Sequence, residues 1–227
     1  MSDVFKNPPP ALSNDYVFDI IKKHYDINPS LTPLVSDRDQ NFKITEEGKS
    51  HIFKIANSAE SKSVLEMQNS ALNYISKKDD SIEIPQPVKT IDGHDILSIQ
   101  ITNTKYYARL LTYVEGVFLK DVKPTNGTTF SVGKFLGYLD KGLAGFNHRA
   151  AKRKFIWDVS QVSLLKSNLT KDDFDLITFF INSFKHDISS LINDFPKTII
   201  HNDGNDQNIL VDSWNRVKGI IDFGDMV

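Results

Sequence analysis

The chain contains no cysteine among its 227 residues. Disulfide bonds, thiolate nucleophiles and zinc–thiolate sites are therefore excluded. Its six histidines are scattered, without the short spacing that is typical of metal ligands. A histidine-rich metal site is therefore not expected.

Long apolar runs are also missing. No stretch of about 18 apolar residues occurs, and the N-terminus has no basic segment followed by an apolar core, so we expect neither a membrane span nor a signal peptide. The net charge of −2 and the pI near 6.3 give no reason to expect nucleic acid or an anionic membrane as a partner. We expect a soluble, cytoplasmic protein.

The glycine-rich loops that usually bind phosphates are absent. Neither G-x-x-x-x-G-K-[ST] nor a G-x-G-x-x-G between the first two expected strands occurs. The loop between those strands, residues 36–41, contains no glycine. A protein-kinase glycine loop is thus excluded. If this loop covers phosphates, it must use backbone N–H groups and the short side chains of Ser36 and Asn41.

The order of expected elements indicates an α+β fold, with strands mostly first and helices afterwards. Residues 1–12, which include three prolines, are predicted to be a disordered tail. Apolar periodicity predicts helices over residues 13–24, 58–75, 128–144 (with Phe130 buried) and 172–195. Alternation predicts strands over 42–45, 51–55, 88–91, 95–101 and 105–111, with a hairpin turn at residues 92–93.

A break directly after the last of these strands predicts a division into two lobes. We expect a nucleotide-binding N-terminal lobe over residues 13–111, a hinge over 112–116 and a partial helical C-terminal lobe over 117–227. The apolar stripe of the 172–195 helix is too wide for a coiled-coil seam and favours a buried globular helix. The basic run at residues 148–154 is interpreted as a solvated helix end or loop rather than an anion site.

One loop carries a pattern suited to phosphoryl transfer. His201, Asp203 and Asn208 stand in the order H-x-D-x-x-x-x-N between two apolar runs, and Asp222 ends a further apolar run. Transfer from a nucleotide needs a carboxylate near the attacking hydroxyl and oxygen ligands for Mg²⁺. The alternative is that these side chains only stabilise a turn-rich loop.

In the functional interpretation each of these side chains has a role. Asp203 accepts or orients the proton of the substrate hydroxyl, and Asn208 and Asp222 hold Mg²⁺. His201 supports the loop, because a base is already present. The chain is thus interpreted as a small-molecule kinase.

Lys54, inside the second expected strand, is the candidate that neutralises nucleotide phosphates. Its alternative is an ordinary solvent-facing strand lysine. Glu66 is chosen as its partner because only a carboxylate would hold a lysine by charge. Gln68 lies closer to the apolar stripe of the same helix, so geometry alone leaves that choice open.

Together these residues resemble the aminoglycoside phosphotransferase/choline kinase superfamily, a relative of the protein kinases. Within it, the segments 155–157, 205–208 and 222–226 are similar to the hydroxylysine kinase branch. The resemblance runs through residues 36–42, 53–55, 66–69, 109–113, 155–158, 201–210 and 219–226. It implies a bilobal, protein-kinase-like fold in which Asp203 is the base, Asn208 and Asp222 bind the metal, and Thr112 and Tyr113 lie in the hinge against the nucleotide base.

The resemblance further implies Mg²⁺-dependent transfer of a γ-phosphate, from GTP in that branch or else ATP, to the hydroxyl of 5-hydroxylysine. Other amino alcohols (choline, an aminoglycoside, homoserine) and a catalytically incomplete nucleotide-binding fragment are the alternatives. Two departures stand out. Asn202 stands where the family usually has glycine. Asparagine tolerates left-handed backbone better than most residues, so the loop is expected to keep its shape. The family also continues with further helices, so we expect an incomplete C-terminal lobe and uncovered apolar surface on the 172–195 helix.

Overall fold

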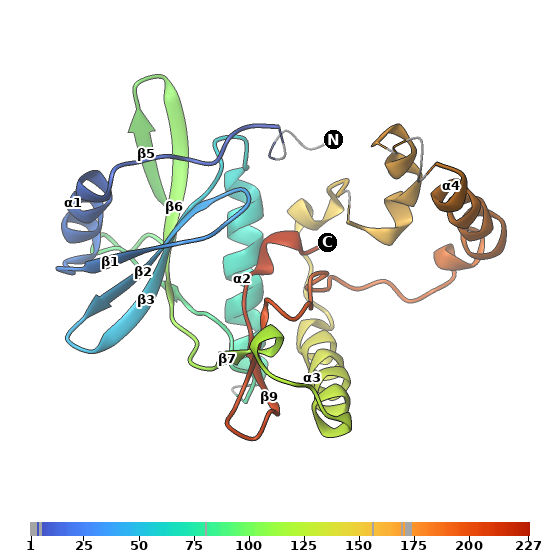
Figure 1. Ribbon diagram of the computed structural model, residues 1–227. Coiled ribbons are helices and arrows are strands. Elements are labelled where there is room, and N and C mark those ends of the chain that lie inside the picture. The colour runs from blue at the N-terminus through green and yellow to red at the C-terminus, as the bar shows by residue number, and fades with distance from the viewer. Residues whose placement is uncertain (1–3, 5, 80, 156, 169, 171–173) are drawn as a thin grey trace.

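The computed structural model describes residues 4, 6–79, 81–155, 157–168, 170 and 174–227. Within these residues the strands form a six-stranded sheet and a three-stranded sheet, with helix α2 (Lys62–Lys78) between the larger sheet and α3 (Asn126–Leu143) (Figure 1).

The larger sheet has the order β1-β2-β3-β6-β4, and β5 also pairs with β6. All of these pairings are antiparallel. The sequence analysis missed β1, whose side chains are mostly exposed and show no alternation. The strands are β1 (Ser30–Leu34), β2 (Gln40–Glu46), β3 (Lys49–Ile55), β4 (Pro87–Val88), β5 (Leu97–Ile101) and β6 (Thr104–Thr112).

The hairpin predicted between β4 and β5 is wrong. The turn itself forms, with the Gly93 N–H donating to the Thr90 carbonyl at 2.8 Å. However, both strands pair with β6 rather than with each other, β4 near Leu110 and β5 towards Thr104. The nine-residue β6 offers an edge long enough for both, and this long-range pairing overrides the local turn signal.

Helix α1 (Asn14–Tyr25) packs on one face of the larger sheet. Ser13 caps it, its side chain accepting from the Tyr16 N–H, and Val17 and Ile21 are fully buried against the sheet. The predicted disorder of residues 1–12 is wrong at the end next to α1. There the Leu12 backbone exchanges two hydrogen bonds of 2.9 Å with the side chain of Gln40 in β2.

Helix α2 (Lys62–Lys78) packs on the opposite face, with Ser61 as its N-cap. Together with α3 (Asn126–Leu143), which begins with a capping box at Thr125, it encloses a second core. Phe135, Leu139 and Leu143 point into this core as predicted, and Phe130 does not. Phe130 is 74% exposed.

A small sheet connects the predicted hinge with the polar loop. It consists of β7 (Val117–Phe118), β8 (Ile209–Val211) and β9 (Val217–Ile220), in that order. Gly116 precedes β7 with φ +155°, and a Cβ there would lie 3.0 Å from the Cβ of Leu210. This close approach requires glycine and brings the segment after β6 directly onto β8.

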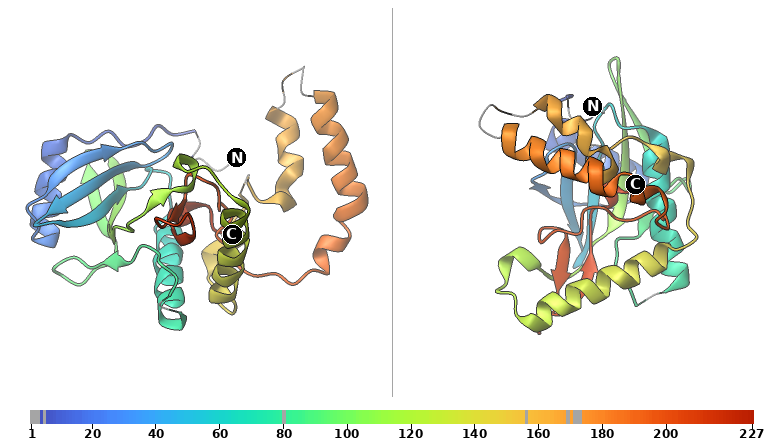
Figure 2. Two further views of the ribbon diagram at one scale, coloured as in Figure 1. Left: turned by 60° about the horizontal axis from the view of Figure 1, so that its bottom comes forward. Right: turned by 90° about the vertical axis from the view of Figure 1, so that its right-hand side faces the viewer.

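The helices between residues 149 and 193 lie away from the larger sheet (Figures 1 and 2). The single helix predicted over residues 172–195 is interrupted, since α4 (Phe174–Ser183) passes into a π-helical turn, η5 (Phe184–Ile188), followed by η6 (Leu191–Asn193); residues 172–173 are not among those described. The expectation of a buried helix is wrong, because Leu176, Phe179 and Phe180 are each more than 60% exposed. The uncovered apolar surface expected on this segment is present. The short 3₁₀ helices of this region are η3 (Arg149–Lys152) and η4 (Val159–Asn168).

In the part of the chain that the structure describes, no helix combines the length and the apolar character needed to cross a membrane.

Candidate functional site

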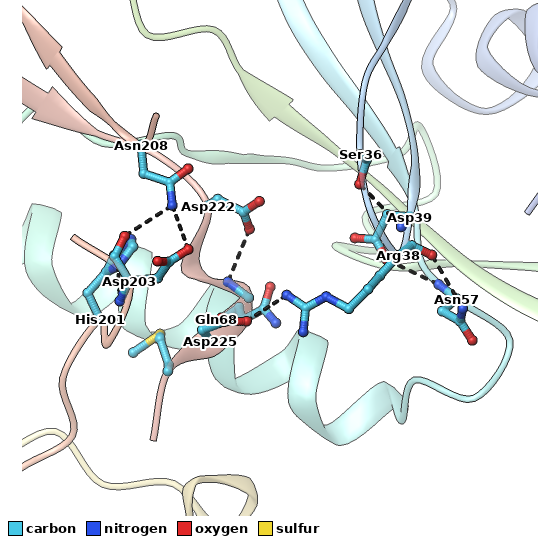
Figure 3. A network of polar contacts seen from close by, with 12 residues as sticks. Ser36, Arg38, Asp39, Asn57, Gln68, His201, Asp203, Asn208, Asp222 and Asp225 are labelled. Atoms are coloured by element: carbon cyan, nitrogen blue, oxygen red, sulfur yellow. Dashed lines mark hydrogen bonds and ion pairs between the residues drawn. The ribbon is translucent and has the colours of Figure 1, made fainter. Parts of the chain in front are cut away.

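The polar loop between residues 201 and 208 folds around the carboxylate of Asp203. The Asn208 amide donates to Asp203 Oδ2 at 2.7 Å and to the Asp203 carbonyl at 3.0 Å, and Asn205 donates to Asp203 Oδ1 at 2.7 Å (Figure 3). Asn202 adopts the left-handed backbone, φ +66°, that was expected where the resembled family has glycine. The carboxylate is therefore held in one orientation at the end of the loop.

His201 is buried, with 3% of its surface exposed, and supports this loop from behind. Its Nδ1 accepts from the Asp203 backbone N–H at 3.2 Å, so Nε2 carries the proton and donates to the Ile221 carbonyl at 3.0 Å. Burial lowers the pKa of His201, which favours this neutral ring. The geometry agrees with the predicted supporting role, since both ring nitrogens are engaged with backbone.

Asp222 follows β9 in a left-handed conformation, φ +60°, which is uncommon for a residue other than glycine. Its Oδ1 accepts from the Gly224 N–H at 3.2 Å and lies 3.2 Å from Lys54 Nζ. The positive charge of Lys54 lowers the pKa of Asp222 to about 2, against the opposing effect of burial. Asp222 is therefore charged throughout the physiological pH range.

Lys54 is not the solvent-facing strand lysine of the alternative interpretation. Its neighbours Phe53 and Ile55 point into the α1 core, so Lys54 points to the α2 face, where 11% of its side chain is exposed. The predicted ion pair with Glu66 is wrong. Glu66 lies on the outer side of α2 and pairs with Lys62 at 3.2 Å, while the carboxylates near Lys54 Nζ are Asp222 and, at 4.0 Å, Asp39.

Gln68 of α2 points towards β6 and is 2% exposed. Its side-chain oxygen accepts from Arg109 of β6, and Asn69 Oδ1 accepts from the same guanidinium at 2.7 Å. Arg109 is the cross-strand neighbour of Lys54. The sequence contained an indication of this contact, because Gln68 and Asn69 are adjacent amides and Gln68 lies close to the apolar stripe of α2. Charge complementarity nevertheless favoured Glu66.

The segment at residues 36–41, which was predicted to lie beside the phosphates and is hereafter called the phosphate-side loop, is fixed by side chains instead of glycine. Ser36 Oγ accepts from the Asp39 N–H at 3.2 Å, and Asp39 Oδ1 accepts from the Asn57 N–H at 3.2 Å. Arg38 reaches across to Asp225, with 2.6 Å between Nη2 and Oδ1 (Figure 3). Asn41, which the structure places in β2, is largely buried, and its Oδ1 has no hydrogen-bond partner in the structure.

Arg153 shows that the interpretation of residues 148–154 as a solvated segment is wrong at this position. Its guanidinium donates to the Gly224 carbonyl at 2.6 Å and to the Met226 carbonyl at 2.9 Å. It also lies 4.4 Å from the centre of the Phe155 ring, which is buried. Burial lowers the pKa of Arg153, and Glu60 opposes that change. Sequence spacing gave no sign of these contacts because they join segments some 70 residues apart.

The two predicted hinge residues lie at the end of β6. Thr112 exchanges hydrogen bonds with the backbone of Gln86, its Oγ1 accepting at 2.8 Å. Lys43 Nζ lies 4.1 Å from the centre of the Tyr113 ring. Both residues are half-buried. The structure thus places them at the junction between the two sheets and does not test a contact with a nucleotide.

The side chains near Asp222 suit Mg²⁺ in type. The Asn208 nitrogen is directed to Asp203, which leaves the Asn208 oxygen on the side of Asp222 (Figure 3). One carboxylate and one amide oxygen are hard ligands of the kind that Mg²⁺ takes, with phosphates and water completing the shell. Among the described residues no group of three or more histidine, aspartate or glutamate side chains is placed to hold a metal ion. The donor set therefore fits a metal that arrives with a phosphate ligand.

A strand lysine thus faces a carboxylate after β9, beside an Asp–Asn loop, on a mixed α and β scaffold. The chain belongs to the phosphotransferase enzyme family, whose model matches residues 30–227. This membership covers both sheets and all the site residues discussed above.

Curated relatives with significant similarity are hydroxylysine kinases. That of Xenopus laevis is 31% identical over 97% of this chain and 67% of its own length. That of Mus musculus is 27% identical over 86% of this chain and 60% of its own length. The chain therefore spans about 60–67% of the length of these relatives.

Solved structures show the same fold at low sequence identity. An amicoumacin kinase in complex with AMP-PNP, Ca²⁺ and Ami matches with a TM-score of 0.72 at 18% identity, over 95% of this chain and 65% of the other. A microcompartment-associated aminopropanol kinase gives 0.72 at 16% identity, over 94% and 70%. The predicted α+β, aminoglycoside phosphotransferase-type fold is confirmed by these likenesses and by the family match.

Proposed function

We propose that this chain transfers the γ-phosphate of a nucleoside triphosphate to an alcohol hydroxyl of a small molecule. The observation that carries the proposal is the convergence of Asp203, Asn208, Asp222 and Lys54 from segments as much as 168 residues apart. A structural loop needs no lysine from the distant β3. Phosphoryl transfer needs this combination of cation, carboxylates and amide oxygen.

Asp203 is proposed to accept a hydrogen bond from the acceptor hydroxyl and to orient its lone pair towards the phosphorus. Asn205 and Asn208 prevent the carboxylate from turning, since each donates to one of its oxygens. His201 holds the backbone of the same residue. Such a fixed geometry lowers the entropic part of the barrier without any change in the chemistry.

Lys54 and Asp222 are proposed to change partners when the nucleotide binds. Lys54 would turn from Asp222 Oδ1, now 3.2 Å away, to the phosphate oxygens. Asp222 and Asn208 would then hold Mg²⁺, which supplies positive charge that offsets the charge of the transferring phosphoryl group. Residues 13–111 are proposed as the nucleotide-binding lobe, with Ser36 and Asn41 on the phosphate side and Thr112 and Tyr113 in the hinge.

For the acceptor we propose 5-hydroxylysine, and for the donor GTP, with ATP as the alternative. The support is the similarity to hydroxylysine kinases from three vertebrates over most of this chain. A second candidate acceptor is another amino alcohol, which the fold likeness to an aminopropanol kinase favours. A cytoplasmic location stays a prediction.

The test is a phosphate-transfer assay with purified protein, Mg²⁺ and either GTP or ATP. 5-Hydroxylysine is compared with choline, an aminoglycoside and homoserine at equal concentrations. We expect more transfer to 5-hydroxylysine than to the other acceptors. Equal transfer to several acceptors would support a general phosphotransferase activity and would contradict 5-hydroxylysine as the specific acceptor. A nucleotide-dependent rise in melting temperature without transfer to any acceptor would support a nucleotide-binding fragment instead.

A further inference from the structure

Arg38 and Asp225 form an ion pair between two segments that are 187 residues apart in the sequence. Arg38 belongs to the phosphate-side loop, and Asp225 lies three residues beyond Asp222. The Arg38 Nη2 to Asp225 Oδ1 distance is 2.6 Å, and the two side chains are 24% and 9% exposed. The attraction between two charges so largely removed from water is screened less than that of a surface pair.

The Arg38 end of this pair is anchored from behind. Asn57, which is 2% exposed, donates through Nδ2 to the Arg38 carbonyl at 3.3 Å. Its backbone N–H donates to Asp39 Oδ1 at 3.2 Å. The guanidinium of Arg38 therefore extends from a fixed backbone, so that movement at its tip is transmitted to the loop.

The Asp225 end is anchored equally well. Arg153 donates to the carbonyls on both sides of Asp225, those of Gly224 and Met226. The Met226 side chain is fully buried in the core formed by α2 and α3. Neither end of the pair is a free side chain on a mobile segment. The pair therefore ties the loop before β2 to the segment after β9.

We propose that Arg38 and Asp225 form a positioning pair that holds the phosphate-side loop at a fixed separation from the segment carrying Asp222. The groups facing the phosphates on the N-terminal side and the metal-binding carboxylate would then be preorganised for one ligand. This inference rests on the proposed function for the identity of that ligand, a Mg²⁺-bound nucleoside triphosphate. The pair acts through the two segments and not on the reacting atoms.

A different role for Arg38 makes the opposite prediction. If Arg38 left Asp225 to bind phosphate directly, neutralising Asp225 would free the guanidinium and would preserve or improve nucleotide affinity. If the pair positions the loop, neutralising either partner weakens nucleotide binding alike. The variants Arg38→Gln, Asp225→Asn and the double variant therefore separate the two roles. Arg216→Gln is the matched control, since it removes an exposed Arg–Asp pair at the turn between β8 and β9.

The first measurement needs no nucleotide. Amide hydrogen exchange is followed in residues 36–41 and 222–226 of the wild type and each variant. We expect faster exchange in both segments in each single variant, with the double variant no faster than the singles, and no change in Arg216→Gln. Unchanged exchange of residues 36–41 in Asp225→Asn would overturn the proposal.

The second measurement is calorimetric titration with Mg²⁺-GTP and Mg²⁺-ATP. We expect each single variant to bind the preferred nucleotide roughly tenfold more weakly, the double variant equally so, and Arg38→Lys to recover part of the loss. Wild-type affinity in Asp225→Asn beside weakened Arg38→Gln would overturn the positioning role. If the wild type binds neither nucleotide, the proposed function fails, while the exchange measurement still decides the pair. Should Arg38→Gln fail to fold, Asp225→Asn and Arg38→Lys carry the same comparison.

Discussion

Lys54 of β3 and Asp222 after β9 lie 168 residues apart in the sequence and 3.2 Å apart in space. The charge of Lys54 accounts for the pKa of about 2 at Asp222. The same two side chains are the ones proposed to face the phosphates and the metal. Their pairing therefore holds both side chains at the proposed site.

The first prediction concerns the pH dependence of this pair. Because the pKa of Asp222 is lowered from an ordinary value of 3.8, its stabilisation is complete above about pH 4 and is lost as the pH falls through about 2. Asp222 is 41% exposed, so solvent screening reduces the contribution to the order of 1 kcal/mol. Lys54→Met should be less stable than the wild type in urea unfolding at pH 5, and this difference should shrink by pH 3. A difference that is constant with pH would contradict the assignment.

Asp203→Asn should abolish turnover while nucleotide binding is retained. The substitution preserves the shape of the side chain but removes the negative charge that orients the acceptor hydroxyl. We expect kcat to fall by about 100- to 10,000-fold, with the dissociation constant of the Mg²⁺-nucleotide nearly unchanged. Asp222→Ala is the comparison, since it should weaken nucleotide binding instead. Retained turnover in Asp203→Asn would exclude the proposed role.

Gln68 should matter more for stability than Glu66. Gln68→Ala removes a buried acceptor from Arg109, whose Nε already has no hydrogen-bond partner in the structure. Leaving a further buried donor of a charged group unpaired costs about 2–3 kcal/mol. Glu66→Ala breaks only a half-exposed pair with Lys62, worth about 0.3–0.5 kcal/mol. Denaturant unfolding measures both, and a larger loss in Glu66→Ala would restore the original assignment.

Gly219→Ala should disturb the strand that leads to Asp222. A Cβ at Gly219 would lie 2.4 Å from the Glu83 carbonyl oxygen, which also accepts from the Ile220 N–H. Since that contact is with backbone, β9 must shift, and we expect a loss of about 2–4 kcal/mol. Gly137→Ala is the control, because its Cβ would meet nothing within 4 Å on the surface of α3. There alanine should stabilise by about 0.5–1 kcal/mol.

The pKa values of two histidines should be shifted in opposite directions from the ordinary value. Burial lowers the pKa of His201, whereas a hydrogen bond to the Asp187 carboxylate raises the pKa of the exposed His186. Because the pKa of His201 is lower in the folded chain than in the unfolded chain, the unfolded chain takes up a proton at His201 first on acidification. The free energy of unfolding should therefore fall as the pH drops below about 6.5. Ring signals in two-dimensional NMR report both titrations. Equal midpoints would show that His201 is not shielded from solvent.

Local patterns predicted most of the strands and the four polar groups Lys54, Asp203, Asn208 and Asp222. The structure brings these four together, while their chemical roles stay predictions. Each was identified from its residue type next to an apolar run, which is information that a short segment contains. The capping of α1 at Ser13 is of the same kind.

What the sequence did not reveal depends on contacts between distant segments. Gln68 accepts a hydrogen bond from the Arg109 guanidinium, whereas Glu66 lies on the outer side of α2 and pairs with Lys62. Arg153 meets the segment after Asp222 only when the chain has folded. The prediction of a buried helix over residues 172–195 is wrong for another reason. Periodicity indicates an apolar face but not whether another element packs against it.

The phosphate-side loop has a consequence for nucleotide choice. A glycine-rich loop adjusts its backbone to whichever phosphates enter, whereas this loop is held by Ser36, Asn57 and the Arg38–Asp225 pair. In the proposed function it would act as a rigid template, whose contacts with the phosphates would be the same for every donor. Selection between guanine and adenine then depends on the other end of the nucleotide, and a glycine introduced at residues 36–41 should loosen phosphate binding without altering base preference.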